Sequence, residues 1–331
     1  MAVVDEKTNN FSDNSSQHND TSSFLRHKEF ISSKTVADIL KDVKPPQADA
    51  LFDMIDTNTI EEAFDLMLAQ DILSIPIYRM DNGEKQYITI VSVWDLLILL
   101  ANQAPLRSVL DHKDILLKPL KEAVGVTKES SRLVIVQPTD SLQHLISLLS
   151  APDTHRVLVQ RQDDVPILLS QMDLINYLQH HNHQLGDIIN ISVEKILDMS
   201  LQRRHGRRVP LKRMMVSSVA IDGFQTLAED GHITALPIID PQGSLIAELC
   251  PQNLRGLNRD RLETLKKPVL MFLKDSQGDL YPPLTCHDQF TLSQIMSSFV
   301  LNHAYRIWWC DVDEQIKGVI TRSDIIGAFA A

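Results

Sequence analysis

Apolar and polar positions recur along this chain in four similar blocks, which begin with amphipathic helical patterns such as residues 61–70. A short apolar run follows each helical pattern, then a polar turn, and then a second apolar run. Two such runs joined by a short polar turn predict a β-hairpin. The first runs are residues 73–78, 154–159, 234–239 and 304–309. The second runs are residues 88–91, 165–169, 245–249 and 317–320.

Each second run leads directly into a four-residue signature and then into another helical pattern. The last signature position recurs at 78, 80 and 71 residues, measured at Asp95, Asp173, Asn253 and Asp324. One position in the first run recurs at 80, 81 and 69 residues, measured at Pro76, Arg156, Pro237 and Arg306. Because two independent positions give nearly the same period, the sequence predicts four repeats.

The repeats are too small to be stable alone, because a unit of about 60 structured residues buries little surface. We therefore expect two pairs of repeats. A tail rich in Asn, Ser, Asp and Thr precedes them and is expected to be disordered. The expected ranges are 1–24 for this tail, 35–105 and 106–185 for repeats 1 and 2, 186–210 for a linker, and 211–265 and 266–331 for repeats 3 and 4.

This pattern resembles the CBS (cystathionine β-synthase) domain, in which the second strand ends in Ser/Thr-x-x-Asp before a helix. Two CBS repeats form a Bateman module. The resemblance implies the α/β architecture of the CBS fold (α+β in detail), with two modules forming a flat disc. Four repeats in one chain resemble the gamma (SNF4-type) subunit of the AMP-activated protein kinase, over about residues 35–331. This implies adenine nucleotides (AMP, ADP or ATP) as ligands, no cofactor, and kinase catalytic and scaffold subunits as partners.

The signature suits a nucleotide sugar. An Asp in the first turn of a helix lies beside free backbone N–H groups, and one carboxylate can accept hydrogen bonds from both hydroxyls of a ribose. Basic strand positions would hold the phosphates. By this resemblance the candidate nucleotide-binding residues are Ser92, Asp95, His155, Arg156, Ser170, Asp173, Arg306, Thr321, Ser323 and Asp324. The simpler interpretation of Ser/Thr-x-x-Asp is a helix N-cap, and one residue can serve both roles.

The chain departs from the family pattern in several places. Cys250 and Asn253 replace the hydroxyl and carboxylate of repeat 3, so we expect a vacant or altered site there. The signature of repeat 2 retains its Asp, where the gamma family usually has basic residues. Repeat 4 has Tyr305 before Arg306 where the family has His-Arg. The number of nucleotide sites that are filled in the gamma family is therefore not expected to hold for this chain.

Composition limits the other possibilities. With 32 Lys and Arg against 43 Asp and Glu, the net charge of −11 disfavours binding to nucleic acid or anionic lipid. Three cysteines in no zinc-binding pattern suit a reduced compartment. No secretory signal or membrane-spanning run is recognised. We expect a cytoplasmic and nuclear protein that binds neither membrane nor nucleic acid.

No catalytic or metal-binding pattern is found, so we expect no enzyme activity. The histidines at 180, 181 and 183 are expected to be a solvated helix end instead of a metal site. The basic residues 203–208 are expected to be a solvated linker, with a localisation or docking patch as the alternative. Two further functions stay open: a four-CBS regulator of a type-2A-like phosphatase, which the Ser- and Asn-rich tail favours slightly, and a ligand-free CBS scaffold.

Overall fold

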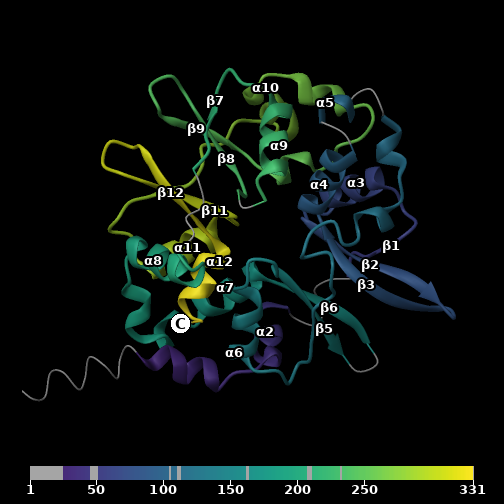
Figure 1. Cartoon of the computed structure of the whole chain (residues 1–331). Coiled ribbons are helices and arrows are strands. Elements are labelled where there is room, and N and C mark those ends of the chain that lie inside the picture. Colours follow the sequence, from purple (N-terminus) through teal and green to yellow (C-terminus); the bar gives the residue numbers. More distant parts are fainter. Residues whose placement is uncertain are drawn as a thin grey trace, which may run out of the picture.

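Four small sheets, one for each expected repeat, make up the framework of the molecule. The structure is a computed structural model, which describes residues 25–44, 51–103, 106–109, 113–161, 164–206, 211–231 and 233–330. The expected tail, residues 1–24, lies outside the described residues. Figure 1 shows the hairpins toward the outside, those of repeats 1 and 2 on one side and those of repeats 3 and 4 on the other.

The four repeats share one order of elements. Repeat 1 contains β1 (Met54–Ile55), α3 (Ile60–Ala69), β2 (Ser74–Asp81), β3 (Glu84–Ser92) and α4 (Val93–Gln103). Repeat 2 contains β4 (Ile135–Val136), α6 (Leu142–Leu149), β5 (Arg156–Arg161), β6 (Asp164–Ser170) and α7 (Gln171–His180). Repeat 3 contains β7 (Met214–Met215), α9 (Ala220–Glu229), β8 (Leu236–Ile239), β9 (Leu245–Leu249) and the 3-10 turn η5 (Pro251–Leu254). Repeat 4 contains β10 (Thr285–Cys286), α11 (Leu292–Leu301), β11 (Arg306–Cys310), β12 (Ile316–Thr321) and α12 (Arg322–Ala328).

All four predicted hairpins are present, and the two strands of each hairpin are antiparallel. In every repeat a two-residue strand ahead of the first helix pairs in parallel with the first hairpin strand. The sequence did not predict these extra strands, because two residues are too few to show a period.

Local sequence explains where the first helix of a repeat begins. The Thr59 hydroxyl accepts a hydrogen bond from the backbone N–H of Glu62, and the Glu62 carboxylate accepts one from the Thr59 N–H at 2.7 Å. This reciprocal cap satisfies two backbone donors that the helix leaves without partners. Thr291 and Gln294 form the same arrangement at the start of α11.

In each pair of repeats, the helix that precedes one repeat contacts the other repeat, so the two repeats exchange these helices. The segment at Thr35, just before α2 (Val36–Val43), bridges to Ser141 of repeat 2, and Thr59 of repeat 1 bridges to Pro119, just before η2 (Leu120–Ala123). The second pair repeats this exchange. Ser192, before α8 (Val193–Arg203), bridges to repeat 4, and Pro268, before α10 (Val269–Gln277), bridges to repeat 3. The exchange therefore joins repeat 1 to repeat 2 and repeat 3 to repeat 4.

The apolar cores run across the two pairs. One core joins repeats 1 and 3, and it contains Phe64, Leu96 and Phe224. The other joins repeats 2 and 4, and it contains Tyr177 and Phe299. Helices thus pack between the pairs, while a smaller cluster around Trp308 lies between the sheets of repeats 3 and 4.

The remaining segments form short helices. They are α5 (Leu106–Val109), η1 (Lys113–Leu117), η3 (Asn182–Gln184), η4 (Gly186–Asn190) and η6 (Leu262–Lys266), and residues 25–32 are also helical. The range 186–210, expected as a linker, differs from that expectation because it contains η4 and α8. Val193 and Ile196 of α8 are fully buried in the core shared with repeat 4. Among the described helices, none is long and apolar enough to cross a membrane.

Candidate functional site

The four signatures adopt the same local geometry, which is that of a helix cap. In repeats 1, 2 and 4 one carboxylate oxygen, Oδ2, accepts the backbone N–H of the first signature residue at 2.8 Å. In repeat 3 the amide oxygen of Asn253 accepts the Cys250 N–H at the same distance. The capping interpretation is therefore present in every repeat. Because a carboxylate has two oxygens, the surroundings of Oδ1 decide whether the residue can also hold a ligand.

In repeat 1 the second oxygen is already used by the chain. Thr127 donates its hydroxyl to Oδ1 of Asp95 at 2.5 Å, and Asp95 is fully buried. Burial raises the pKa of Asp95, although hydrogen bonds from Ser92, Thr127 and Ser130 act in the opposite direction. Asp95 therefore has no open carboxylate oxygen in this structure.

The carboxylate of repeat 4 is also covered, in this case by α8. Oδ1 of Asp324 accepts hydrogen bonds from Ser200 and from Nη2 of Arg204, the latter at 2.7 Å. Arg203 lies alongside and donates to the carbonyl oxygen of Ser323 at 3.2 Å. The Asp324 side chain is 2% exposed. Two arginines that the sequence placed in a solvated linker thus cover a predicted ligand-binding carboxylate.

Gly327 makes the approach of Arg203 possible. A Cβ atom at this position would lie 1.5 Å from Nη2 of Arg203, so the guanidinium occupies the space that any larger residue would need. The first turns of α12 and the end of α8 are therefore fitted closely together.

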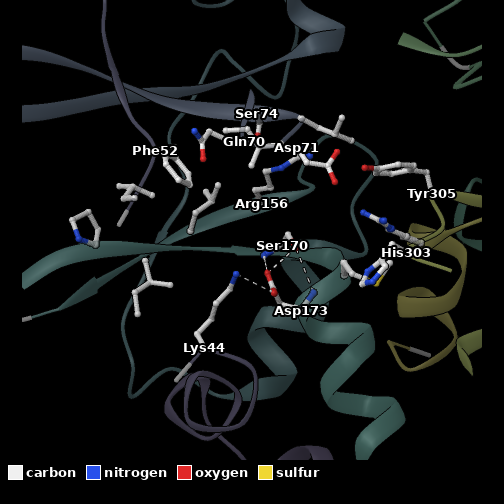
Figure 2. Close-up of a pocket in the computed structure, with 18 of the residues that line it drawn as sticks. Lys44, Phe52, Gln70, Asp71, Ser74, Arg156, Ser170, Asp173, His303 and Tyr305 are labelled. Carbon is white, nitrogen blue, oxygen red and sulfur yellow. Dashed lines mark hydrogen bonds and ion pairs between the residues drawn. The ribbon is translucent and has the colours of Figure 1, made fainter. Parts of the chain in front are cut away.

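The carboxylate of repeat 2, by contrast, opens onto a cavity of about 640 Å³, here called the Asp173 pocket. Oδ2 of Asp173 accepts from the hydroxyl and backbone N–H of Ser170, and Oδ1 lies 3.3 Å from Nζ of Lys44. Figure 2 shows Ser170 and Asp173 at the start of α7, with Lys44 directed at the carboxylate. This ion pair is half-buried, with the Lys44 and Asp173 side chains 24% and 17% exposed, so a ligand that uses Oδ1 shares it with Lys44 or displaces the lysine.

Basic side chains from three repeats line the same pocket. They are Lys44, Arg156, Arg161, His303 and Arg322, and Figure 2 shows Arg156 and His303 at the pocket together with Tyr305. Arg322 donates two hydrogen bonds to the carbonyl oxygen of Ala304, at 2.7 and 3.0 Å, and its guanidinium lies 4.4 Å from the centre of the Tyr305 ring.

The charge of Arg322 is poorly compensated. Burial lowers its pKa to about 10, and the positive charges of Arg156 and Arg306 act in the same direction. Arg156 has a carboxylate of Glu129 at 3.8 Å, and no ion pair within 4.0 Å is found for Arg322 among the described residues. An anion bound in this pocket would relieve the unfavourable energy of these neighbouring cations.

The lining of the Asp173 pocket also includes apolar side chains. They are Leu51, Phe52, Ile72 and Leu73 of repeat 1 and Ile167 and Met172 of repeat 2, and the polar residues Gln70, Asp71 and Ser74 line the pocket as well. The apolar residues around Phe52 suit a flat ring. The pocket thus combines apolar side chains, an open carboxylate and a cationic end.

A second cavity, of about 510 Å³, lies at the signature of repeat 3 and is here called the Asn253 pocket. Cys250, Asn253, Arg255 and Arg306 line it. We expected this site to be vacant or altered, and the structure places an open cavity there. His303 and Tyr305 line both pockets, so the two cavities share a wall of repeat 4.

The structure thus places the predicted site residues in different surroundings. Asp173, Ser170 and Arg156 line the Asp173 pocket, and Arg306 lines the Asn253 pocket. The other predicted residues line neither pocket: Ser92, Asp95, His155, Thr321, Ser323 and Asp324.

Three of those residues have other contacts. Nδ1 of His155 lies 2.8 Å from Glu129, and Ser323 accepts a hydrogen bond from Gln171. Thr321 caps α12 through Asp324. Burial would raise the pKa of Glu129, but the charges of His155 and Arg156 outweigh it and lower this pKa.

Sequence reasoning did not assign a role to three residues of the Asp173 pocket. Arg322 stands inside the signature of repeat 4, so a basic residue at that position was a usable signal. Lys44 and Tyr305 gave no such signal, because they reach the pocket only through the helix exchange and the contact between repeats 2 and 4. Within the described residues, no group of three or more His, Cys, Asp and Glu could hold a metal ion, and all three cysteines are buried free thiols.

No protein-family model matches the chain. In three dimensions it is similar to the crystal structure of a Methanocaldococcus jannaschii protein described as an archaeal homolog of gamma-AMPK, with a TM-score of 0.66 over 90% of this chain and all of that one, at 15% identity. The fold is therefore that of four CBS repeats, paired as two Bateman modules. The predicted fold class is therefore confirmed, and the helix exchange described above is what joins the CBS repeats within each module.

Similar sequences carry regulatory names. A gamma-like regulatory subunit of an SNF1-related protein kinase from Arabidopsis thaliana is 22% identical, over 83% of this chain and 90% of that protein. The gamma subunit of the 5′-AMP-activated protein kinase from Kluyveromyces lactis is 21% identical, over 90% and 89% of the two chains. The protein SDS23 of the same yeast is 21% identical over 82% of this chain, which spans 58% of that protein. The chain thus resembles gamma and gamma-like protein kinase subunits across most of its length.

Proposed function

We propose that this chain is an adenine-nucleotide-binding, energy-sensing regulatory subunit of a Ser/Thr protein kinase of the AMP-activated class. The observation that carries the proposal is the Asp173 pocket, in which an open carboxylate, apolar side chains and a group of cations face one cavity. The resemblance to kinase gamma subunits supports the choice of partner.

The parts of a nucleotide match the parts of this pocket. The two ribose hydroxyls donate to Oδ1 of Asp173, while Ser170 holds Oδ2 in position. The adenine ring packs on the apolar side chains near Phe52. The phosphates lie against Arg156 and Arg322, where the local field favours negative charge.

Regulation would follow from differential binding. A nucleotide that binds one arrangement of the repeats more tightly than another shifts their populations, with a coupling of typically about 1–3 kcal/mol. Because the Asp173 pocket includes residues of repeats 1, 2 and 4, its occupancy reports on how the two modules sit together. In this proposal the chain performs no catalysis, and it acts in the cytoplasm and nucleus.

The test is calorimetric titration of the full chain with AMP, ADP and ATP. Asp173→Asn should weaken AMP binding by about tenfold or more, because it removes a charge-assisted acceptor from the ribose. Asp95→Asn is the matched control, since both oxygens of Asp95 are already bonded within the chain. The control should bind AMP as the wild type does. Equal AMP affinity in the wild type and in Asp173→Asn would defeat the proposal.

A phosphatase of the type-2A-like class remains the second candidate partner, and a ligand-free scaffold the third. Purification of the tagged chain from cells separates the first two, because either kinase or phosphatase subunits should co-purify. A scaffold without ligand predicts no change in melting temperature with AMP, whereas a bound ligand at 100 times its dissociation constant adds about 2.7 kcal/mol.

A further inference from the structure

The Asn253 pocket presents a hydrogen-bond donor where the Asp173 pocket presents an acceptor. Oδ1 of Asn253 accepts from the backbone N–H of Cys250 at 2.8 Å and from its thiol at 3.2 Å. A backbone N–H can only donate, so the amide oxygen must face Cys250. The amide nitrogen is then the atom left for a ligand, and no hydrogen bond from it is found within the described residues.

Other polar atoms of this pocket also lack partners. Nε of Arg255 and Nε of Arg306 are buried without a hydrogen bond, and the Arg306 side chain is 3% exposed. These two Nε atoms lie below the surface of the cavity, so Nδ2 of Asn253 is the donor that a ligand in the pocket can reach.

The acidic group of the pocket is already neutralised. Glu248 accepts from Arg306 at 2.5 Å and from the indole N–H of Trp308 at 2.7 Å. At the motif position itself the side chain is a neutral amide, so nothing there repels an anion. In the Asp173 pocket the equivalent position carries a negative charge, which accepts from a diol and repels a phosphate.

A phosphate ester matches the Asn253 pocket better than a free diol. Its oxygens only accept, so they can take a hydrogen bond from the Asn253 amide, and the two arginines that line the pocket are paired with Glu248 and Asp71. A free diol has two donors to satisfy, and Asn253 offers them no acceptor.

We propose that the Asn253 pocket binds a nucleotide whose ribose carries a phosphate on its 2′ or 3′ oxygen, with that phosphate against Nδ2 of Asn253. The inference rests on the proposed function in one respect, the placing of a ribose against the motif residue. The Asp173 and Asn253 pockets then select two different classes of nucleotide.

The experiment titrates the full chain with adenosine 3′,5′-bisphosphate, adenosine 2′,5′-bisphosphate and AMP, and compares the wild type with two reciprocal variants. Asn253→Asp keeps an acceptor for the Cys250 N–H, as in the three other repeats, but sets a negative charge against the phosphate. It should weaken the favoured bisphosphate by about tenfold or more. Asp173→Asn should weaken AMP, because it removes the charge-assisted acceptor for the ribose.

The outcomes separate the two proposals. If Asp173→Asn binds AMP like the wild type, the proposed function fails, and the Asn253→Asp comparison still decides the present inference. If neither bisphosphate binds the wild type, or if Asn253→Asp binds the favoured one as tightly, the inference is overturned. Should Asn253→Asp not fold, as judged by its melting curve, Asn253→Ser decides, because it removes the amide donor without adding a charge: it should weaken the favoured bisphosphate by about tenfold, and wild-type affinity would overturn the inference.

Discussion

The three signature aspartates, Asp95, Asp173 and Asp324, differ in the partner of one carboxylate oxygen. Each uses Oδ2 to cap a helix, and the partner of Oδ1 then sets the role: a threonine at Asp95, α8 at Asp324, and a pocket at Asp173. A cap and a ligand contact are therefore compatible in one residue. The signature alone identifies only the cap, because the partner of the second oxygen comes from distant sequence.

Asp95→Asn should stabilise the chain at neutral pH. Burial raises the pKa of Asp95, so the folded chain holds this proton more tightly than the unfolded chain does. Stability is then lost as pH rises above the unfolded value of about 3.9. The amide keeps the acceptor for Ser92 and carries no charge. Melting curves should show the variant a few degrees more stable at pH 7, with the difference shrinking toward pH 4.

Asp324→Asn is the matched comparison for that measurement. Its carboxylate pairs with Arg204 at 2.7 Å, so the amide should lower stability at pH 7, by about 1–2 kcal/mol. If both variants shift the melting temperature in the same direction, the two buried carboxylates do not differ as described.

At the scale of elements, the contact between α8 and α12 covers the carboxylate of Asp324. Gly327→Ala should disturb it, because a Cβ atom would lie 1.5 Å from the guanidinium of Arg203 and would force that side chain away from Ser323. We expect the free energy of unfolding to fall by about 1–2 kcal/mol in denaturant titrations. Gly231→Ala is the control, since no atom lies within 4 Å of a Cβ there. Equal stability of the two variants would contradict the close fit.

The elements show what the sequence could and could not predict. The hairpins and their signatures followed from the period, whereas Asp173 and Arg156, which line one pocket, were named as candidates by resemblance to the CBS domain. Lys44 and Arg204 could not be placed, because α2 and α8 cover repeats that lie far along the chain. A periodic pattern predicts the order of helices and strands within each repeat. Contacts between repeats depend on side chains that do not recur from one repeat to the next.

For the whole molecule, the covered carboxylates limit how many AMP molecules can bind. Asp95 and Asp324 are covered, and Asn253 offers a donor to the sugar, so one AMP per chain is expected, in the Asp173 pocket. Calorimetry or equilibrium dialysis at saturating AMP measures this ratio. Three or four molecules per chain would show that the covering residues give way to ligand.

The shared wall of the two pockets bears on regulation. His303 and Tyr305 line both cavities, so a ligand that moves either side chain changes the surface offered to the second ligand. Any such coupling must be reciprocal in the two binding free energies.

The exchanged helices also have a consequence for how such a chain can be built. Thr35 bridges to Ser141, and Thr59 bridges to Pro119, so each repeat of a module is covered by the helix that precedes the other repeat. A fragment cut between the two repeats would leave both with bare apolar faces toward water. The smallest part of this architecture that can fold alone is thus a pair of repeats. Duplication of a single repeat would give a copy that lacks its covering helix.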